Sequence, residues 1–375
     1  MALPVQPESR RGTRRALAAV LMGGLAGATA ATSAASAQSG SAQLSGAFQQ
    51  IGLGDAWART NGDCSNVLIA VIDNGVDTGH PGLRANVAAN GGDAIDGLDN
   101  DNNSYVDDLF GWNFQPGNNN VQPDADDAMG VPWHGTYVTG ILGATGMGGQ
   151  AVSGVCQKAR IVPIKKLFAT SDRPGAEDQA AAAVNYAVDY QRRESARQGR
   201  YVPMVINASW VIANSWANAP MTLASAMINA VNAGIPMVFA AGNNSASNDD
   251  AGAVALPAGW SAFTDYVIAV GAVDANDRLS SVSNYGNAVT ITAPAVNIVS
   301  TSPGGGYAAD IAGGNGFTSF AAPQVTAAIA MYWSQHPDAP FSAVRNALLS
   351  SADHIDGLPV LNGNRLNIGR MLTQF

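Results

Sequence analysis

Runs of consecutive apolar residues recur along the chain from residue 67 onward. They alternate with segments whose apolar residues repeat every three to four positions. Continuous apolar runs are typical of strands buried on both faces of a sheet, and the longer periodic segments are typical of helices. The predicted strands are 67–73, 160–167, 202–209, 235–242, 265–273 and 288–295, and the predicted helices are 134–143, 177–193, 220–232, 318–335 and 341–351.

This order of elements predicts an α/β fold with a parallel, doubly wound sheet covered by helices on both faces. We expect one domain over residues 38–375. Its segments 89–131 and 243–264 are rich in Asn, Asp, Gly and Pro, as surface loops are. Because 47% of the residues are hydrophobic and 13% are charged, the chain can bury a large core, which excludes disordered, fibrous and coiled-coil proteins.

Residues 1–37 have the pattern of a cleavable export signal. Two arginine pairs precede an apolar run over 16–31, and Ala35-Ser36-Ala37 offers a cleavage site after Ala37. A single membrane anchor is the alternative, but the run is short and consists mainly of Ala and Gly. The arginine pairs suit both twin-arginine export and ordinary secretion. We therefore expect a secreted or periplasmic protein with no membrane span after signal cleavage.

The two cysteines, Cys64 and Cys156, each lie just upstream of a predicted strand, 67–73 and 160–167. If those strands are parallel neighbours, both sulfurs lie at the same edge of the sheet, and an oxidising destination permits a bond between them. We predict a disulfide.

The charge is acidic and unevenly distributed. The chain has 19 Lys and Arg against 28 Asp and Glu, a net charge of −9, so it has no basic surface for a nucleic-acid backbone and we expect no nucleic-acid partner. Nine aspartates but no Lys or Arg stand between Arg84 and Lys158. The predicted acidic insert at about 89–131 contains all nine.

Part of this insert resembles the first half of a calcium-binding loop. Oxygen ligands alternate at Asp99, Asp101 and Asn103, a backbone carbonyl is available at Tyr105, and Asp107 follows. The glycine expected at the sixth position and the glutamate expected at the twelfth are missing. A solvated acidic loop is therefore the alternative. We expect structural Ca²⁺, because the insert holds no counter-charge, and no organic cofactor.

Four polar residues stand where chemistry is often found in α/β proteins. Asp73 ends the first strand, Asn243 follows a later strand, His134 begins a helix, and Ser319 lies where a Gly-rich loop enters a helix. Each has an ordinary structural explanation as a turn or cap residue. Together they supply an orienting carboxylate, an amide donor, a base and a hydroxyl nucleophile.

Six segments carry a resemblance to a known family. AVIDNGVD, HGTYVTGI, VINASW, VFAAGNN, YVIAVGAVD and FTSFAAP resemble, in order, the signature segments of subtilisin-like serine proteases, and GNRLNIGRML resembles that family's last helix. The resemblance covers residues 44–375. It implies a subtilisin-like fold for the single domain.

The resemblance also implies roles. Asp73 orients the imidazole, His134 is the general base and then acid, Ser319 is the nucleophile, and Asn243 forms the oxyanion hole with the Ser319 amide. The substrate backbone would pair with Ser209, Trp210 and Val211. The pocket for the side chain before the scissile bond would be lined by Ala240, Ala241 and Gly242.

The chain departs from the family pattern beside the nucleophile. Phe317 stands where the family has Gly, either as a substitution or as an insertion after Gly316. A Gly permits a positive φ that Phe resists, so we expect Phe317 to disturb the helix start or fill the leaving-group side of the cleft. Tyr137 and Gln324 replace family histidines. Trp210 and Val211 stand where the family has Leu-Gly, and we expect them to narrow the cleft.

These patterns predict an exported, monomeric serine endopeptidase that acts on peptides or proteins through an acyl-enzyme. A subtilase-like scaffold that binds peptide or protein without turnover is the alternative. A hydrolase of small esters is a third hypothesis, weakened because no G-x-S-x-G motif leads into Ser319.

Overall fold

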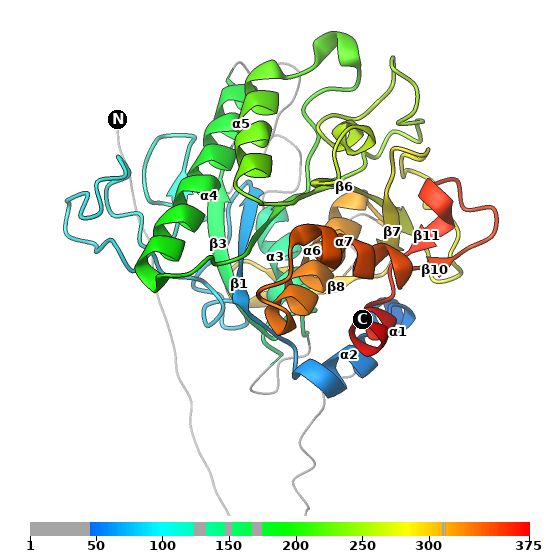
Figure 1. The fold of residues 1–375 in the computed structure, drawn as a ribbon, viewed down its shortest axis with the longest axis horizontal. Coiled ribbons are helices and arrows are strands. Elements are labelled where there is room, and N and C mark those ends of the chain that lie inside the picture. The colour runs from blue at the N-terminus through cyan, green and yellow to red at the C-terminus, as the bar shows by residue number, and fades with distance from the viewer. Residues whose placement is uncertain (1–45, 124–132, 147–151, 167–174, 310, 312) are drawn as a thin grey trace, which may run out of the picture. The chain divides into compact units, whose positions relative to one another are not determined.

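The computed structural model describes residues 46–123, 133–146, 152–166, 175–309, 311 and 313–375, which lie within one compact unit, Ser41–Phe375. Among these residues nine strands form one sheet in the order β10-β11-β7-β6-β5-β4-β1-β3-β2 (Figure 1). All neighbours are parallel except β10 and β11. The strands are β1 Asp63–Asp73, β2 Trp112–Asn113, β3 Lys158–Lys165, β4 Met204–Ala208, β5 Met237–Ala240, β6 Val267–Val273, β7 Ile291–Pro294, β10 Asp353–His354 and β11 Asn364–Arg365.

Helices cover both faces of the sheet, which confirms the predicted doubly wound α/β fold. One face carries α3 (His134–Gly143), α6 (Thr318–Gln335), α7 (Phe341–Ser350) and α8 (Ile368–Gln374), and the other carries α4 (Ala176–Gln198) and α5 (Met221–Asn232). Successive side chains of β1 point to opposite faces of the sheet, and both faces are buried, so its apolar run is continuous. Ile69 and Val71 join the core under α3 and α6, while Leu68, Ala70 and Ile72 join the core under α4.

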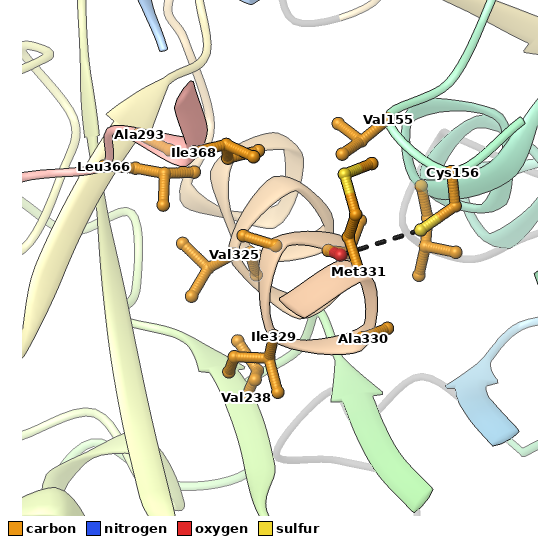
Figure 2. Close-up of a cluster of buried hydrophobic side chains, with 14 of the residues drawn as sticks. Val155, Cys156, Val238, Ala293, Val325, Ile329, Ala330, Met331, Leu366 and Ile368 are labelled. Atoms are coloured by element: carbon orange, nitrogen blue, oxygen red, sulfur yellow. Dashed lines mark hydrogen bonds between the residues drawn. The ribbon is translucent and has the colours of Figure 1, made fainter. Parts of the chain in front are cut away.

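Helix α6 is the centre of the larger core. Every residue from Thr318 to Ser334 is buried, in keeping with a sequence that is apolar around the whole helix. Figure 2 shows its side chains among Val238 of β5 and Ala293 of β7, with Leu366, Ile368 and Val155 on other sides. The position of the first turn of α6, which carries Ser319, is therefore held by packing along the whole helix.

Sequence reasoning missed several short elements. Helices α1 (Gly46–Gln50) and α2 (Leu53–Thr60) precede β1, and the hairpin of β8 (Val299–Ser302) and β9 (Gly306–Ala309) lies beside α3. Their apolar patterns are too short to stand out. The Pro-Gly-Gly-Gly turn at 303–306 was a usable hairpin signal.

The predicted disulfide is present. Cys64 and Cys156 are bonded, fully buried and 5.8 Å apart at Cα. The pairing of Asp63 with Lys158 in β1 and β3 brings the two segments together at the end of the sheet where both strands begin. In the part of the chain that the structure describes, no helix is both long and apolar enough to cross a bilayer. The predicted signal, residues 1–37, lies outside the described residues.

Candidate active site

Asp73 and His134 form a buried hydrogen-bonded pair at the carboxyl end of β1. His134 Nδ1 lies 2.9 Å from Asp73 Oδ1 and 3.2 Å from Oδ2, and the backbone N–H of Asn74 also donates to Oδ1. An ionised carboxylate only accepts hydrogen bonds, so the imidazole carries its proton on Nδ1. This tautomer leaves Nε2 with a lone pair, the form that a general base requires.

The start of α3 comes unusually close to the end of β1. Gly135 donates its backbone N–H to the Asn74 side chain at 2.8 Å. A Cβ atom at Gly135 would lie 2.3 Å from the carbonyl oxygen of Gly75 and 2.9 Å from the Cβ of Asp73. Only glycine allows this approach, and the approach brings the imidazole of His134 onto the carboxylate.

Ser319 is the second residue of α6 and is 4% exposed. The next side chain, Phe320, lies with its ring centroid 6.1 Å from that of His134, so the starts of α3 and α6 are side by side. Pro323 has no N–H to donate to the Ser319 carbonyl one turn back. The hydroxyl of Ser209, just after β4, donates to this carbonyl instead at 3.0 Å.

Asn243 caps the helix that carries Ser319. Its Oδ1 accepts from both the backbone N–H and the hydroxyl of Thr318, each at 2.9 Å, and the Thr318 hydroxyl also accepts from Gly242 N–H at 3.2 Å. Because a backbone N–H can only donate, the atom facing it is the oxygen. Asn243 is an exposed residue, so its Nδ2 group is the end available to a ligand, and the N–H that follows Thr318 in the first turn of α6 belongs to Ser319.

The predicted substrate strand follows β4. Ser209 and Trp210 are each 3% exposed, and Val211 is partly exposed. The expectation that Trp210 narrows the cleft is wrong. Its indole N–H donates to the carbonyl of Ile72 at 2.7 Å, and Lys166 Nζ lies 4.1 Å from its ring centroid, so the ring belongs to the core.

The residues predicted to line the side-chain pocket end β5 and begin the loop to Asn243. Ala240 and Ala241 are buried, and Gly242 has a φ of +107°. A Cβ at Gly242 would lie 2.6 Å from the side-chain nitrogen of Asn284, which explains the glycine. The pocket itself stays a prediction.

Sequence comparison places these residues in a known family. The model of the subtilase family matches residues 64–368. This chain is a subtilase. Among its relatives, a thermophilic serine proteinase of Bacillus sp. (strain AK1) is 34% identical over 304 residues, covering 80% of this chain and 60% of that protein. Subtilisin E of Bacillus subtilis (strain 168) is 29% identical over 300 residues, covering 78% and 61%.

Solved structures give the same fold. The MycP3 protease from the type VII (ESX-3) secretion system has a TM-score of 0.61 at 25% identity, with 89% of each chain covered. A cold adapted subtilisin-like serine proteinase has a TM-score of 0.59 at 23% identity, covering 82% of this chain and 91% of that one. The chain spans about 60% of the length of the first two curated relatives.

The departures of this subtilase beside Ser319 are accommodated without backbone strain. Phe317 has φ −75° and ψ 142°, an ordinary extended conformation, whereas Gly316 takes the positive φ of +60°. The glycine that takes the positive φ is thus still present at Gly316, which favours the alternative in which Phe317 is an insertion after it. Tyr137 donates to the carbonyl of Ile298, and the Gln324 side chain donates to that of Phe320 at 3.0 Å, so both substitutions serve packing.

The predicted calcium ligands of this subtilase lie in one loop and are occupied largely by backbone groups. Asp99 accepts from the N–H groups of Asn103 and Ser104, and Asp107 accepts from two N–H groups at 96–97. The ring of Tyr105 packs on Trp112, with the centroids 5.0 Å apart. Within the described ranges, no three His, Cys, Asp or Glu side chains are gathered for a metal.

Asp108 is a buried acid that the sequence did not distinguish from its neighbours. It is fully buried, and Tyr186, Asn90 and Asn103 donate to its carboxylate at 2.6–2.9 Å. Burial raises the pKa of Asp108 to about 6 against the lowering effect of these donors. The group ties the acidic loop to α4 through Tyr186.

Proposed function

We propose that this subtilase is a serine endopeptidase that hydrolyses peptide bonds through an acyl-enzyme on Ser319. The observation that carries the proposal is the buried hydrogen bond from His134 to Asp73, with the nucleophile's helix beside it. The names of its relatives, serine proteinase and subtilisin, support the same reaction. Labelling of Ser319 by a fluorophosphonate tests it.

The mechanism begins with attack of Ser319 Oγ on the scissile carbonyl carbon. His134 Nε2 takes the hydroxyl proton as the C–O bond forms, and Asp73 stabilises the resulting imidazolium. The oxyanion accepts hydrogen bonds from Asn243 Nδ2 and the Ser319 N–H. His134 then gives its proton to the leaving nitrogen as the C–N bond breaks. Water hydrolyses the remaining ester by the same steps.

Replacing Asn243 by aspartate tests the oxyanion hole. Aspartate keeps an oxygen facing Thr318, so the cap of α6 is retained, but it has no N–H to donate. We expect kcat on a peptide substrate to fall by about 10² to 10³ with KM little changed. Steady-state kinetics measure both quantities.

Thr318→Val serves as the control for the cap, because it removes the hydroxyl that bonds to Asn243 and leaves the N–H. We expect Thr318→Val to lower the free energy of unfolding and to leave kcat much closer to the wild-type value than Asn243→Asp does. An Asn243→Asp enzyme with unchanged kcat would remove Asn243 from the mechanism.

We propose that the substrate is a peptide or protein held as an added strand along Ser209–Val211. The carboxyl ends of β1 and β4 lie side by side there, because the two strands are paired in parallel. We also propose export of the protein. The signal pattern of residues 1–37 and the disulfide, which persists in oxidising compartments, support it.

We further propose that the acidic loop binds structural Ca²⁺. Asp101 Oδ1 is buried and accepts no hydrogen bond among the described residues, although Arg193 Nη1 of α4 lies 3.9 Å away and supplies a counter-charge that the insert itself lacks. A cation bound in direct contact would satisfy this oxygen more fully. The further ligands would be Asp99, Asn103, Asp107 and the Tyr105 carbonyl, which are neighbours in the chain. Their carboxylates are not gathered in the described structure, so calcium would have to draw them together.

Removal of calcium is therefore expected to destabilise the protein. Binding to the folded state alone at a hundredfold excess over Kd contributes about 2.7 kcal/mol, which a chelator would remove. Thermal denaturation in calcium and in EDTA measures the effect. The variant Asp99→Asn/Asp101→Asn should melt at one temperature in both conditions. Identical melting of the wild type in both conditions would contradict the proposal.

A further inference from the structure

We propose that Phe317 forms the subsite for the residue that follows the scissile bond and selects large apolar side chains there. The inference rests on the proposed peptidase function and names one determinant of its substrate class.

Phe317 is the outer member of an aromatic cluster at the starts of α3 and α6. Its ring is partly exposed and lies 6.0 Å from that of the buried Phe320, centroid to centroid. Phe320 in turn lies 6.1 Å from the imidazole of His134 and 4.9 Å from Tyr137. Trp133, also partly exposed, lies 6.1 Å from Tyr137. We call Trp133, Tyr137, Phe317 and Phe320 the aromatic cluster.

The reaction fixes which part of the substrate meets this cluster. His134 must protonate the leaving nitrogen, so the residue that departs lies beside the imidazole. Phe320 packs on that imidazole, and Phe317 is the partly exposed ring next to Phe320. Asn243, which contacts Thr318 at the same helix start, is assigned to the oxyanion in the proposed mechanism and so does not contact the leaving residue. The leaving residue therefore meets Phe317.

The chemistry of the cluster sets the preference. All four side chains are aromatic, and the hydroxyl of Tyr137 is already used on the carbonyl of Ile298. A large apolar side chain would bury surface against the Phe317 ring, whereas a charged one would lose water without gaining a partner. The backbone of Phe317 is unstrained, so the ring can be removed without releasing a forced conformation.

The preference of this subsite can be measured from how the acyl-enzyme divides between reaction with water and reaction with an added amino-acid amide. A peptide methyl ester acylates Ser319 and releases methanol, and an added amino-acid amide then competes with water. The α-amino nitrogen of the amino-acid amide bonds to the acyl carbon, the bond to Ser319 Oγ breaks, and His134 carries a proton from that nitrogen to Oγ. This step is the reverse of peptide cleavage, so the amide occupies the leaving-residue subsite.

We expect the wild type to prefer phenylalanine amide over glycine amide by about tenfold. Phe317→Ala should reduce that preference to about twofold, Phe317→Leu should restore part of it, and Phe317→Glu should favour lysine amide over phenylalanine amide. Hydrolysis of the ester should change less than twofold in Phe317→Ala, because methanol does not reach the ring. Phe263→Ala, which removes a ring that is 74% exposed and outside the aromatic cluster, is the matched control.

The outcomes separate the two proposals. Normal ester hydrolysis with equal use of both amides, or a preference that survives Phe317→Ala, overturns the role of Phe317 and leaves the peptidase intact. Loss of ester hydrolysis together with the preference would mean that Phe317 only supports the fold of the site, which also overturns the inference. A wild type that hydrolyses no ester overturns the peptidase proposal and this inference with it.

Discussion

Ser319→Ala is expected to lower kcat on a peptide substrate by about 10⁶ and to abolish labelling by a fluorophosphonate. The alanine enzyme loses the atom that attacks the carbonyl, while the Asp73–His134 pair and the capped start of α6 remain. Labelling of the purified protein, followed by casein hydrolysis, measures the two effects.

Ser342→Ala is the matched control, since Ser342 is an exposed serine in the first turn of α7. It should label and cleave like the wild type. A folded wild type that neither labels nor cleaves would favour the alternative in which the chain binds peptide or protein without turnover. Labelling that survives in Ser319→Ala would assign the nucleophile to another residue.

Removing the disulfide is expected to lower the free energy of unfolding by about 2–5 kcal/mol without changing kcat. The bond joins residues 92 positions apart, and the double variant Cys64→Ala/Cys156→Ala frees that long loop in the unfolded chain. Cys64 lies at the start of β1 and Asp73 at its end, about 30 Å away at 3.3 Å per residue. The bond is therefore remote from the chemistry.

Urea denaturation of the wild type and the double variant measures the loss, and kinetics at low temperature measure kcat. Because both cysteines are fully buried, a reductant should leave the folded wild type unaffected and act only once it unfolds. Equal unfolding midpoints would contradict the prediction. A large fall in kcat in the folded variant would show that the bond also shapes the active site.

The apolar runs predicted the sheet well because its central strands are buried on both faces, where nearly every residue must be apolar. The same pattern could have placed Trp210. Met204, Ile206, Ala208 and Trp210 alternate along β4 and its continuation, and all four join the core under α4 and α5. Alternate residues of a strand face the same side, so this pattern places Trp210 in the core and not in the cleft.

Other features of the site could not be derived from local patterns. The cap on α6 comes from Asn243, 75 residues earlier, and the partner of the Ser319 carbonyl is Ser209, 110 residues earlier. Such contacts depend on strand order, which the apolar runs do not determine. The conformation of Phe317 depends on Gly316 taking the positive φ instead.

The burial of α6 has a consequence for how this protein loses activity. A helix that is exposed on one side can fray or open while the rest of a domain stays folded, but α6 is enclosed from Thr318 to Ser334. Its amide hydrogens should therefore exchange with solvent only when the whole domain opens. Heat should then reduce the number of active molecules without producing slower ones, so residual activity and residual native structure should decline together.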